Sequence, residues 1–146
     1  MPPGINSRYE HFNDAVEVLR EIKSSYSFED FIKEIIDKKN YVLRDRVEHN
    51  FEKAVISLTD IANFLITENR WSKLQSRKDI FDILAEHNLV KEQDVEIFKE
   101  FVRQRNIITH EYAVVDYKKI RNLLEYIDKL VECMEKILSQ LNLTEI

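Results

Sequence analysis

Apolar side chains recur every three or four positions along most of this chain, which is the spacing of one face of an α-helix. Polar residues with capping-box spacing stand at 7–10 and 27–30, just before the first two apolar stretches, and mark helix starts there. The pattern predicts helices over about residues 7–26, 28–36, 41–67 and 76–88, and a fifth from about residue 91 into the polar segment 103–112.

The last amphipathic stretch is the most regular of all. Its apolar positions widen to about three per heptad, which favours a bundle helix facing a core over a narrow two-stranded seam. We expect one helix of roughly 26 residues, about 39 Å long, with Asp116 as its N-cap. The stripe comprises Tyr117, Ile120, Leu123, Leu124, Ile127, Leu130, Val131, Met134, Ile137, Leu138 and Leu141.

Composition strengthens the helical interpretation. The only glycine and both prolines lie in the first four positions, whereas sheet proteins need such residues at their turns. The same scarcity excludes phosphate-cradling glycine loops and dinucleotide folds. We therefore predict an all-α, up-and-down bundle of five to six helices, with a disordered lead over residues 1–6 and a single domain over residues 7–146.

Charge, cysteine content and hydropathy indicate what the protein can bind and in which compartment we expect it. The net charge of −5 argues against non-specific adhesion to nucleic acid but permits a local basic groove. Cys133 is the only cysteine, so no internal disulfide forms, and we expect it to be a small buried residue rather than a nucleophile. No apolar run reaches about 18 residues, and no signal peptide precedes the first helix. We expect a cytoplasmic protein without a membrane segment.

The segment 103–112 holds the richest candidate chemistry, in Arg105, Asn106, His110 and Tyr112. Arginine offers a planar fork for phosphate oxygens, and histidine moves protons near neutral pH. On a straight helix Arg105 and His110 would lie about 140° apart, whereas Asn106 and His110 would share a face. The arginine and histidine can converge if the helix ends near Thr109, or if a second subunit completes the site. The alternative is a helix-end histidine beside an arginine in a surface salt bridge.

Other candidate sites are weaker. A second Arg-x-x-x-x-His match, from Arg44 to His49, lies among alternating acids and indicates a charged helix face. No histidine follows a glutamate by three positions, and there is no His-Glu-x-x-His, so no metal site is predicted. A basic run around Trp71 is either an RNA-contacting edge or a solvated loop. It comprises Arg70, Lys73, Arg77 and Lys78.

Residues 105–112 resemble the Arg-x-x-x-x-His-x-Tyr signature of HepT-type HEPN proteins, including the Arg-Asn opening. Residues 74–84 resemble the family's segment after its long helix, and residues 60–63 a pattern late in that helix. The resemblance covers about residues 5–141. The connection at 69–75 departs from the family pattern because it lacks proline and glycine.

The resemblance implies a homodimer and a metal-independent endoribonuclease without a cofactor, the toxin of a toxin–antitoxin system. The antitoxin would be a minimal nucleotidyltransferase, which in some systems transfers AMP groups to the motif tyrosine. By matching position, Arg105 and His110 would be catalytic, Asn106 supportive through His110, and Tyr112 the AMP acceptor. Two alternatives are a helical subunit that binds the nucleotidyltransferase without cleaving RNA, and a helical adaptor without chemistry.

Overall fold

Helices form nearly all of the computed structural model, which describes residues 3–72, 79–110 and 114–145. The part of the chain so described contains no strand, and the prediction of an all-α fold is confirmed. A π-helical turn, Lys33–Asp37, continues the second helix, and a 3₁₀ turn, Glu92–Asp94, precedes the fifth. The helices are α1 (Pro3–Ser25), α2 (Phe28–Ile32), α3 (Tyr41–Asn69), α4 (Ile80–Glu86), α5 (Val95–Thr109), α6 (Tyr117–Leu124) and α7 (Ile127–Glu145).

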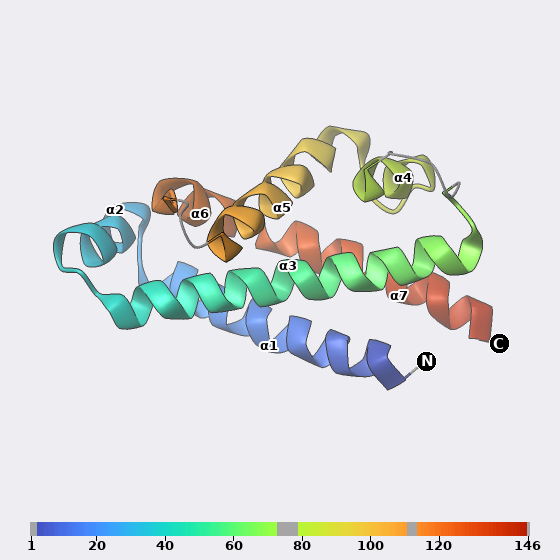
Figure 1. The fold of residues 1–146 in the computed structure, drawn as a ribbon, viewed down its shortest axis with the longest axis horizontal. Coiled ribbons are helices and arrows are strands. Elements are labelled where there is room, and N and C mark those ends of the chain that lie inside the picture. The colour runs from blue at the N-terminus through green and yellow to red at the C-terminus, as the bar shows by residue number, and fades with distance from the viewer. Residues whose placement is uncertain (1–2, 73–78, 111–113, 146) are drawn as a thin grey trace.

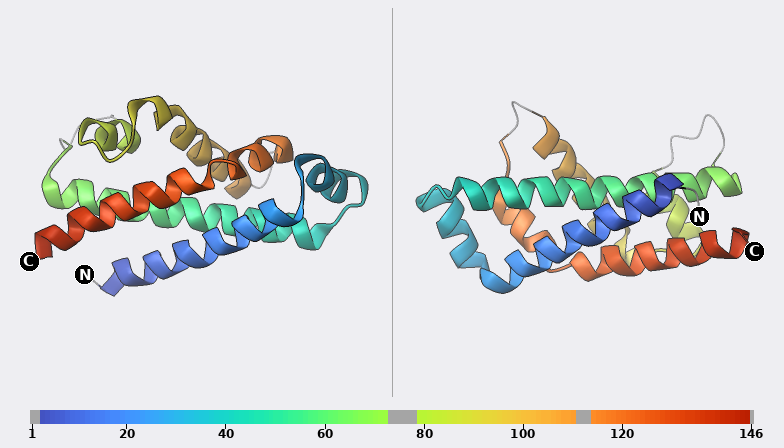
Figure 2. Two further views of the ribbon diagram at one scale, coloured as in Figure 1. Left: turned by 180° about the vertical axis from the view of Figure 1, so that it is seen from behind. Right: turned by 90° about the horizontal axis from the view of Figure 1, so that it is seen from below.

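The long helix α3 is the centre of the bundle and contacts α1, α4, α5 and α7. The helices α1 and α5 run along α3 in the opposite direction, and α7 runs in the same direction (Figure 1). Seen from behind and from below, α2 and α6 gather at one end of the molecule, while both termini lie at the other (Figure 2). The arrangement is the up-and-down bundle that short connections between long helices favour.

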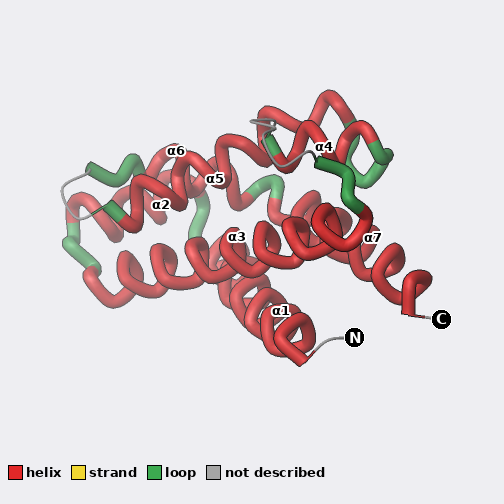
Figure 3. The backbone as a smooth tube through the Cα atoms, turned by 45° about the vertical axis from the view of Figure 1, so that its right-hand side comes forward, coloured by secondary structure: helices red, strands yellow, loops and turns green. Residues whose placement is uncertain are grey.

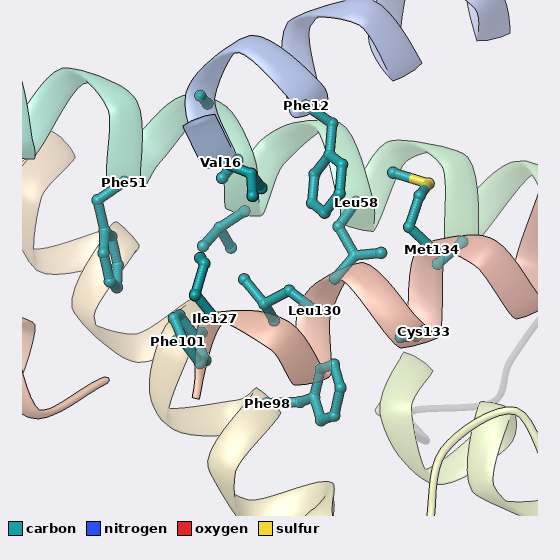
Figure 4. Close-up of a cluster of buried hydrophobic side chains, with 14 of the residues drawn as sticks. Phe12, Val16, Phe51, Leu58, Phe98, Phe101, Ile127, Leu130, Cys133 and Met134 are labelled. Atoms are coloured by element: carbon teal, nitrogen blue, oxygen red, sulfur yellow. The ribbon is translucent and has the colours of Figure 1, made fainter. Parts of the chain in front are cut away.

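Aromatic and aliphatic side chains from α1, α3, α5 and α7 meet in one core (Figure 4). The rings of Phe51 and Phe101 stack with their centroids 5.5 Å apart, and those of Phe81 and Phe98 lie 5.0 Å apart. Cys133 is 2% exposed within this core, as predicted, and burial raises the pKa of its thiol to about 12. The stacked pair Phe51 and Phe101 fixes α5 on α3 one turn before the candidate motif.

Side-chain caps mark most helix starts. Ser27 accepts a hydrogen bond from the backbone N–H of Asp30, and Asp116 accepts from the N–H groups of Lys118 and Lys119, so both predicted caps are confirmed. The start of α4 is capped by Asp79, whereas the predicted start at residue 76 lies outside the described residues. These caps satisfy N–H groups that have no partner inside the helix.

The first helix begins earlier than the sequence predicted. It starts at Pro3, whereas we expected a disordered lead over residues 1–6 and a cap at Ser7. Ile5 is only 4% exposed and belongs to the hydrophobic core. Burial of this side chain extends the helix by a turn, because packing outweighs the weak local start signal.

The last stretch is two helices rather than the single one that we predicted. The tube in Figure 3 separates α6 from α7, and the break falls at 125–126. The two parts have different neighbours: α6 contacts α1, α2 and α5, whereas α7 contacts α1 and α3. Arg121 is 5% exposed and donates hydrogen bonds to the carbonyls of Lys23 and Tyr26 at the end of α1. These contacts anchor α6 in a direction that α7 does not follow.

No helix in the described part of the chain is long and apolar enough to cross a membrane.

Candidate functional site

The first residues of the candidate motif, 105–109, form the last turn and a half of α5. The helix closes at Thr109, and His110 has an extended backbone (φ −91°, ψ 110°). The N–H of His110 donates to the carbonyl of Ile107 at 3.1 Å, and the Thr109 hydroxyl donates to the carbonyl of Asn106 at 2.9 Å. Because His110 leaves the helix, the 140° separation from Arg105 on a straight helix does not apply.

Arg105 and Asn106 contact each other directly. Arg105 Nη1 donates a hydrogen bond of 2.8 Å to Asn106 Oδ1. The sequence predicts that Asn106 supports the site through His110, and the structure adds this contact with Arg105. The amide oxygen holds one edge of the guanidinium and leaves its charge intact.

Arg105 has no carboxylate partner in the part of the chain that the structure describes. Its Nε is buried and forms no hydrogen bond to any described residue. The neighbouring arginine, Arg103, differs: it forms an ion pair with Glu100 one turn earlier. The surface salt bridge of the alternative interpretation is therefore absent for Arg105 among these residues.

Gln104 is a polar residue of this region that the sequence analysis missed. It is 2% exposed, its Nε2 donates to Glu100 Oε1 at 2.8 Å, and its own Oε1 has no hydrogen-bond partner among the described residues. A sequence signal existed, because Gln104 follows the buried Phe101 by three positions and so falls on the inner face of α5. Buried polar side chains without full hydrogen bonding are costly and concentrate at functional sites.

The chain beyond the motif is fastened to α3. The hydroxyl of Tyr117, the first residue of α6, donates to Glu48 Oε2 at 2.8 Å. Burial and this hydrogen bond to a carboxylate raise the pKa of Tyr117 well above its ordinary value. The protonated phenol therefore acts as a structural donor that holds the start of α6 beside the second turn of α3.

The second Arg-x-x-x-x-His match is the charged helix face that its sequence predicted. Arg44 lies 2.9 Å from Asp45 and 3.8 Å from Glu48, and its guanidinium stacks on the Tyr41 ring at 4.5 Å. The hydrogen bond to Asp45 raises the pKa of Arg44. With two carboxylates beside it, this arginine is neutralised, whereas Arg105 has no carboxylate beside it among the described residues.

Of the remaining residues predicted to contact RNA or to accept AMP, the structure describes only Arg70. Tyr112, Lys73, Arg77 and Lys78 lie outside the described residues. Arg70 is exposed and ends α3 in the left-handed conformation, with a φ of 53°. The neighbouring Trp71 stacks on His87, with ring centroids 3.8 Å apart, so this indole face is already covered by an imidazole.

Within the described ranges, no group of three or more histidine, cysteine, aspartate or glutamate residues could hold a metal ion.

Comparisons with known proteins place the chain in a family. A family model described as ribonuclease HepT-like matches residues 12–137. The chain is similar to the mRNA nuclease HepT of Shewanella oneidensis, at 27% identity over 89 residues that cover 61% of this chain and 67% of the relative.

Two solved structures share the fold. One is the tri-AMPylated HEPN toxin of Shewanella oneidensis in complex with an MNT antitoxin, with a TM-score of 0.75, 20% identity, and coverage of 95% of this chain and 99% of the other. The second is a toxin–antitoxin complex with AMP-PNP, with a TM-score of 0.71, 20% identity, and coverage of 94% and 99%.

Proposed function

The chain belongs to the ribonuclease HepT-like family, and from that premise we propose that it is a metal-independent endoribonuclease, the toxin of a two-component system. The observation that carries the proposal is the end of α5. There, a guanidinium held by Asn106 has no carboxylate partner among the described residues, and His110 terminates the same helix. A fixed cation and a proton-transfer group are the two requirements of RNA cleavage without a metal.

The reaction is a transesterification at phosphorus. The ribose 2′-oxygen attacks the adjacent phosphate and loses its proton to a base, while the bond from phosphorus to the 5′-oxygen breaks and that oxygen gains a proton. His110 would serve one of these proton transfers, a contribution typically worth about 10²–10⁴ in rate. Arg105 would stabilise the negative charge that develops on the phosphoryl oxygens.

A second copy of the chain supplies the second half of the site in this proposal. Each chain contributes one Arg105 and one His110, so a two-fold dimer places two cations and two imidazoles at one cleft. One histidine can then accept the 2′-hydroxyl proton while the other donates to the 5′-oxygen. The exposed, basic Arg70 and the residues Lys73, Arg77 and Lys78 would contact the RNA backbone in the cytoplasm.

Neutralisation by a nucleotidyltransferase fits the same site. The solved relative is tri-AMPylated and bound to an MNT antitoxin, and Tyr112 lies two positions after His110. In the proposed step the Tyr112 oxygen attacks the α-phosphorus of ATP and pyrophosphate leaves. The resulting phosphodiester would add a negative charge within the motif, which would compete with the RNA phosphate for Arg105.

The experiment is an RNA cleavage assay with purified protein in the presence of a chelator. We expect His110→Ala and Arg105→Ala to lose cleavage, while Arg44→Ala, which removes the ion-paired arginine of the second match, remains active. Retention of wild-type cleavage by His110→Ala would remove the catalytic assignment. A protein that binds a nucleotidyltransferase yet neither cleaves RNA nor inhibits growth would instead be the non-catalytic subunit of the alternative interpretation.

A further inference from the structure

A groove of about 490 Å³ runs between α1 and α3, and the motif does not use it. Figure 1 shows α1 and α5 flanking α3 on opposite sides, so the groove lies across α3 from the motif helix. The two walls present polar groups at helical spacing, one turn apart along each helix. The lining includes Ser7, Arg8 and His11 from α1, and His49, Lys53 and Ser57 from α3.

Most hydrogen-bond donors of this groove are uncommitted. Arg8 is paired with Asp60 at 3.1 Å. His11, His49 and Lys53 form no side-chain hydrogen bond or ion pair with any residue that the structure describes. The remaining charged group in the lining is Glu52. Beside Arg8, Glu52 and Asp60, the groove therefore presents the Lys53 ammonium, two imidazoles and two serine hydroxyls.

The groove begins beside the residues that fasten the motif to α3. Glu48, which accepts the hydrogen bond of Tyr117, immediately precedes His49. Phe51, which stacks on Phe101 of α5, immediately precedes Glu52. One turn of α3 therefore contacts the motif helix and the start of α6 on one side and the groove on the other.

We propose that the groove between α1 and α3 is a second phosphate-binding subsite, which holds the backbone of the RNA strand outside the scissile bond. This inference rests on the proposed function, because it assigns a path to the substrate of the Arg105 and His110 site. Donors without internal acceptors, here the Lys53 ammonium and the two imidazoles, suit phosphate oxygens. Arg8, Glu52, Lys53 and Asp60 are the other charged groups that face the two histidines, and both walls come from α1 and α3.

The test compares RNA lengths. The variant Lys53→Ala and the double variant His11→Ala with His49→Ala are placed in a His110→Ala background, so that the RNA stays intact. Binding is measured by fluorescence anisotropy with a labelled dinucleotide and with a single strand of about 12 nucleotides. The matched control is Lys91→Ala, because Lys91 is exposed and lies outside the groove.

We expect Lys53→Ala to weaken binding of the longer strand about 3- to 10-fold and to leave dinucleotide binding unchanged. Its slope of log affinity against log salt should fall by about 0.7, the value for one lost phosphate contact on a single strand. The double histidine variant should likewise weaken binding of the longer strand and leave dinucleotide binding unchanged. Circular dichroism verifies that each variant is folded.

Two results would overturn the groove assignment. One is that both groove variants bind the longer strand as tightly as Lys91→Ala; the other is that AMP occupies the groove more tightly than RNA, which would make it a nucleotide site. In either case cleavage by the wild-type protein would leave the proposed function standing. Failure of the wild-type protein to bind or cleave any RNA would refute the proposed function itself.

Discussion

Substitution of Asn106 tests directly whether its hydrogen bond to Arg105 supports the site. Its amide oxygen accepts a hydrogen bond of 2.8 Å from the Arg105 guanidinium. A hydrogen bond to a charged group contributes about 1.5–3 kcal/mol when desolvated. Because Asn106 is exposed, we reduce this to about 1 kcal/mol. The variant Asn106→Ala should then lower kcat for RNA cleavage about 5-fold.

The effect should appear in kcat rather than KM, because orientation of Arg105 matters most where charge develops in the transition state. The isosteric variant Asn106→Asp keeps the acceptor but adds a carboxylate that competes with phosphate for the guanidinium. It should therefore raise KM, whereas Asn106→Ala should not. Single-turnover cleavage kinetics over a range of RNA concentrations separate the two quantities.

The reasoning fails if Asn106→Ala cleaves with the wild-type kcat, since the contact would then be incidental. It also fails if Asn106→Asp retains the wild-type KM, since Arg105 would then not bind phosphate. Thermal unfolding of both variants provides the control. An exposed residue at the last turn of α5 should leave the melting temperature almost unchanged, so a loss of activity cannot be attributed to unfolding.

Three further predictions concern the scaffold. The Cys133 thiol, with a pKa of about 12, should be about 10⁻⁴ ionised at pH 8 and should react with thiol reagents only after denaturation; rapid labelling of the folded protein would contradict its burial. The variant Phe101→Ala should reduce the free energy of unfolding by about 3–5 kcal/mol, measured by denaturant titration, because it removes a buried ring stacked on Phe51. Arg121 holds the pKa of Glu125 below its ordinary value, so this carboxylate contributes stability above its ordinary pKa and loses it as pH falls through the lowered one. The melting-temperature advantage over Glu125→Gln at neutral pH should accordingly vanish in acid, and an advantage that is unchanged there would refute the ion pair's role.

Helical periodicity was sufficient to predict the bundle because each long helix buries one continuous stripe. It could not reveal the break between α6 and α7, since Leu124 and Ile127 are both buried and the stripe passes through the break without interruption. The break follows from what each part packs against, and Arg121 is the residue that anchors α6 to the end of α1. A buried arginine inside an apolar stripe looks like a solvated residue until its carbonyl acceptors, 95 and 98 positions away, are known.

In the candidate site, too, the sequence predicted the local backbone but not the side-chain contacts. The end of α5 near Thr109 was predictable from the β-branched residues around it, because these weaken helix propensity. The contact between Asn106 and Arg105 was not predictable, because adjacent residues on a helix do not ordinarily face each other. It forms because the long, flexible arginine side chain bends toward its neighbour. Gln104 was missed because a single polar residue on an apolar face has no signature beyond its position.

Ion pairing, rather than spacing, is what separates the two Arg-x-x-x-x-His matches. Among the described residues, Arg8, Arg20, Arg44, Arg46, Arg103 and Arg121 each form an ion pair with a carboxylate. Arg105 forms none with a described carboxylate, although the chain carries an excess of acids. A protein with a net charge of −5 can bind a polyanion only through cations that its own carboxylates do not neutralise. Among the described residues, Arg105 meets that condition at the match that also ends a helix, whereas Arg44 meets neither requirement.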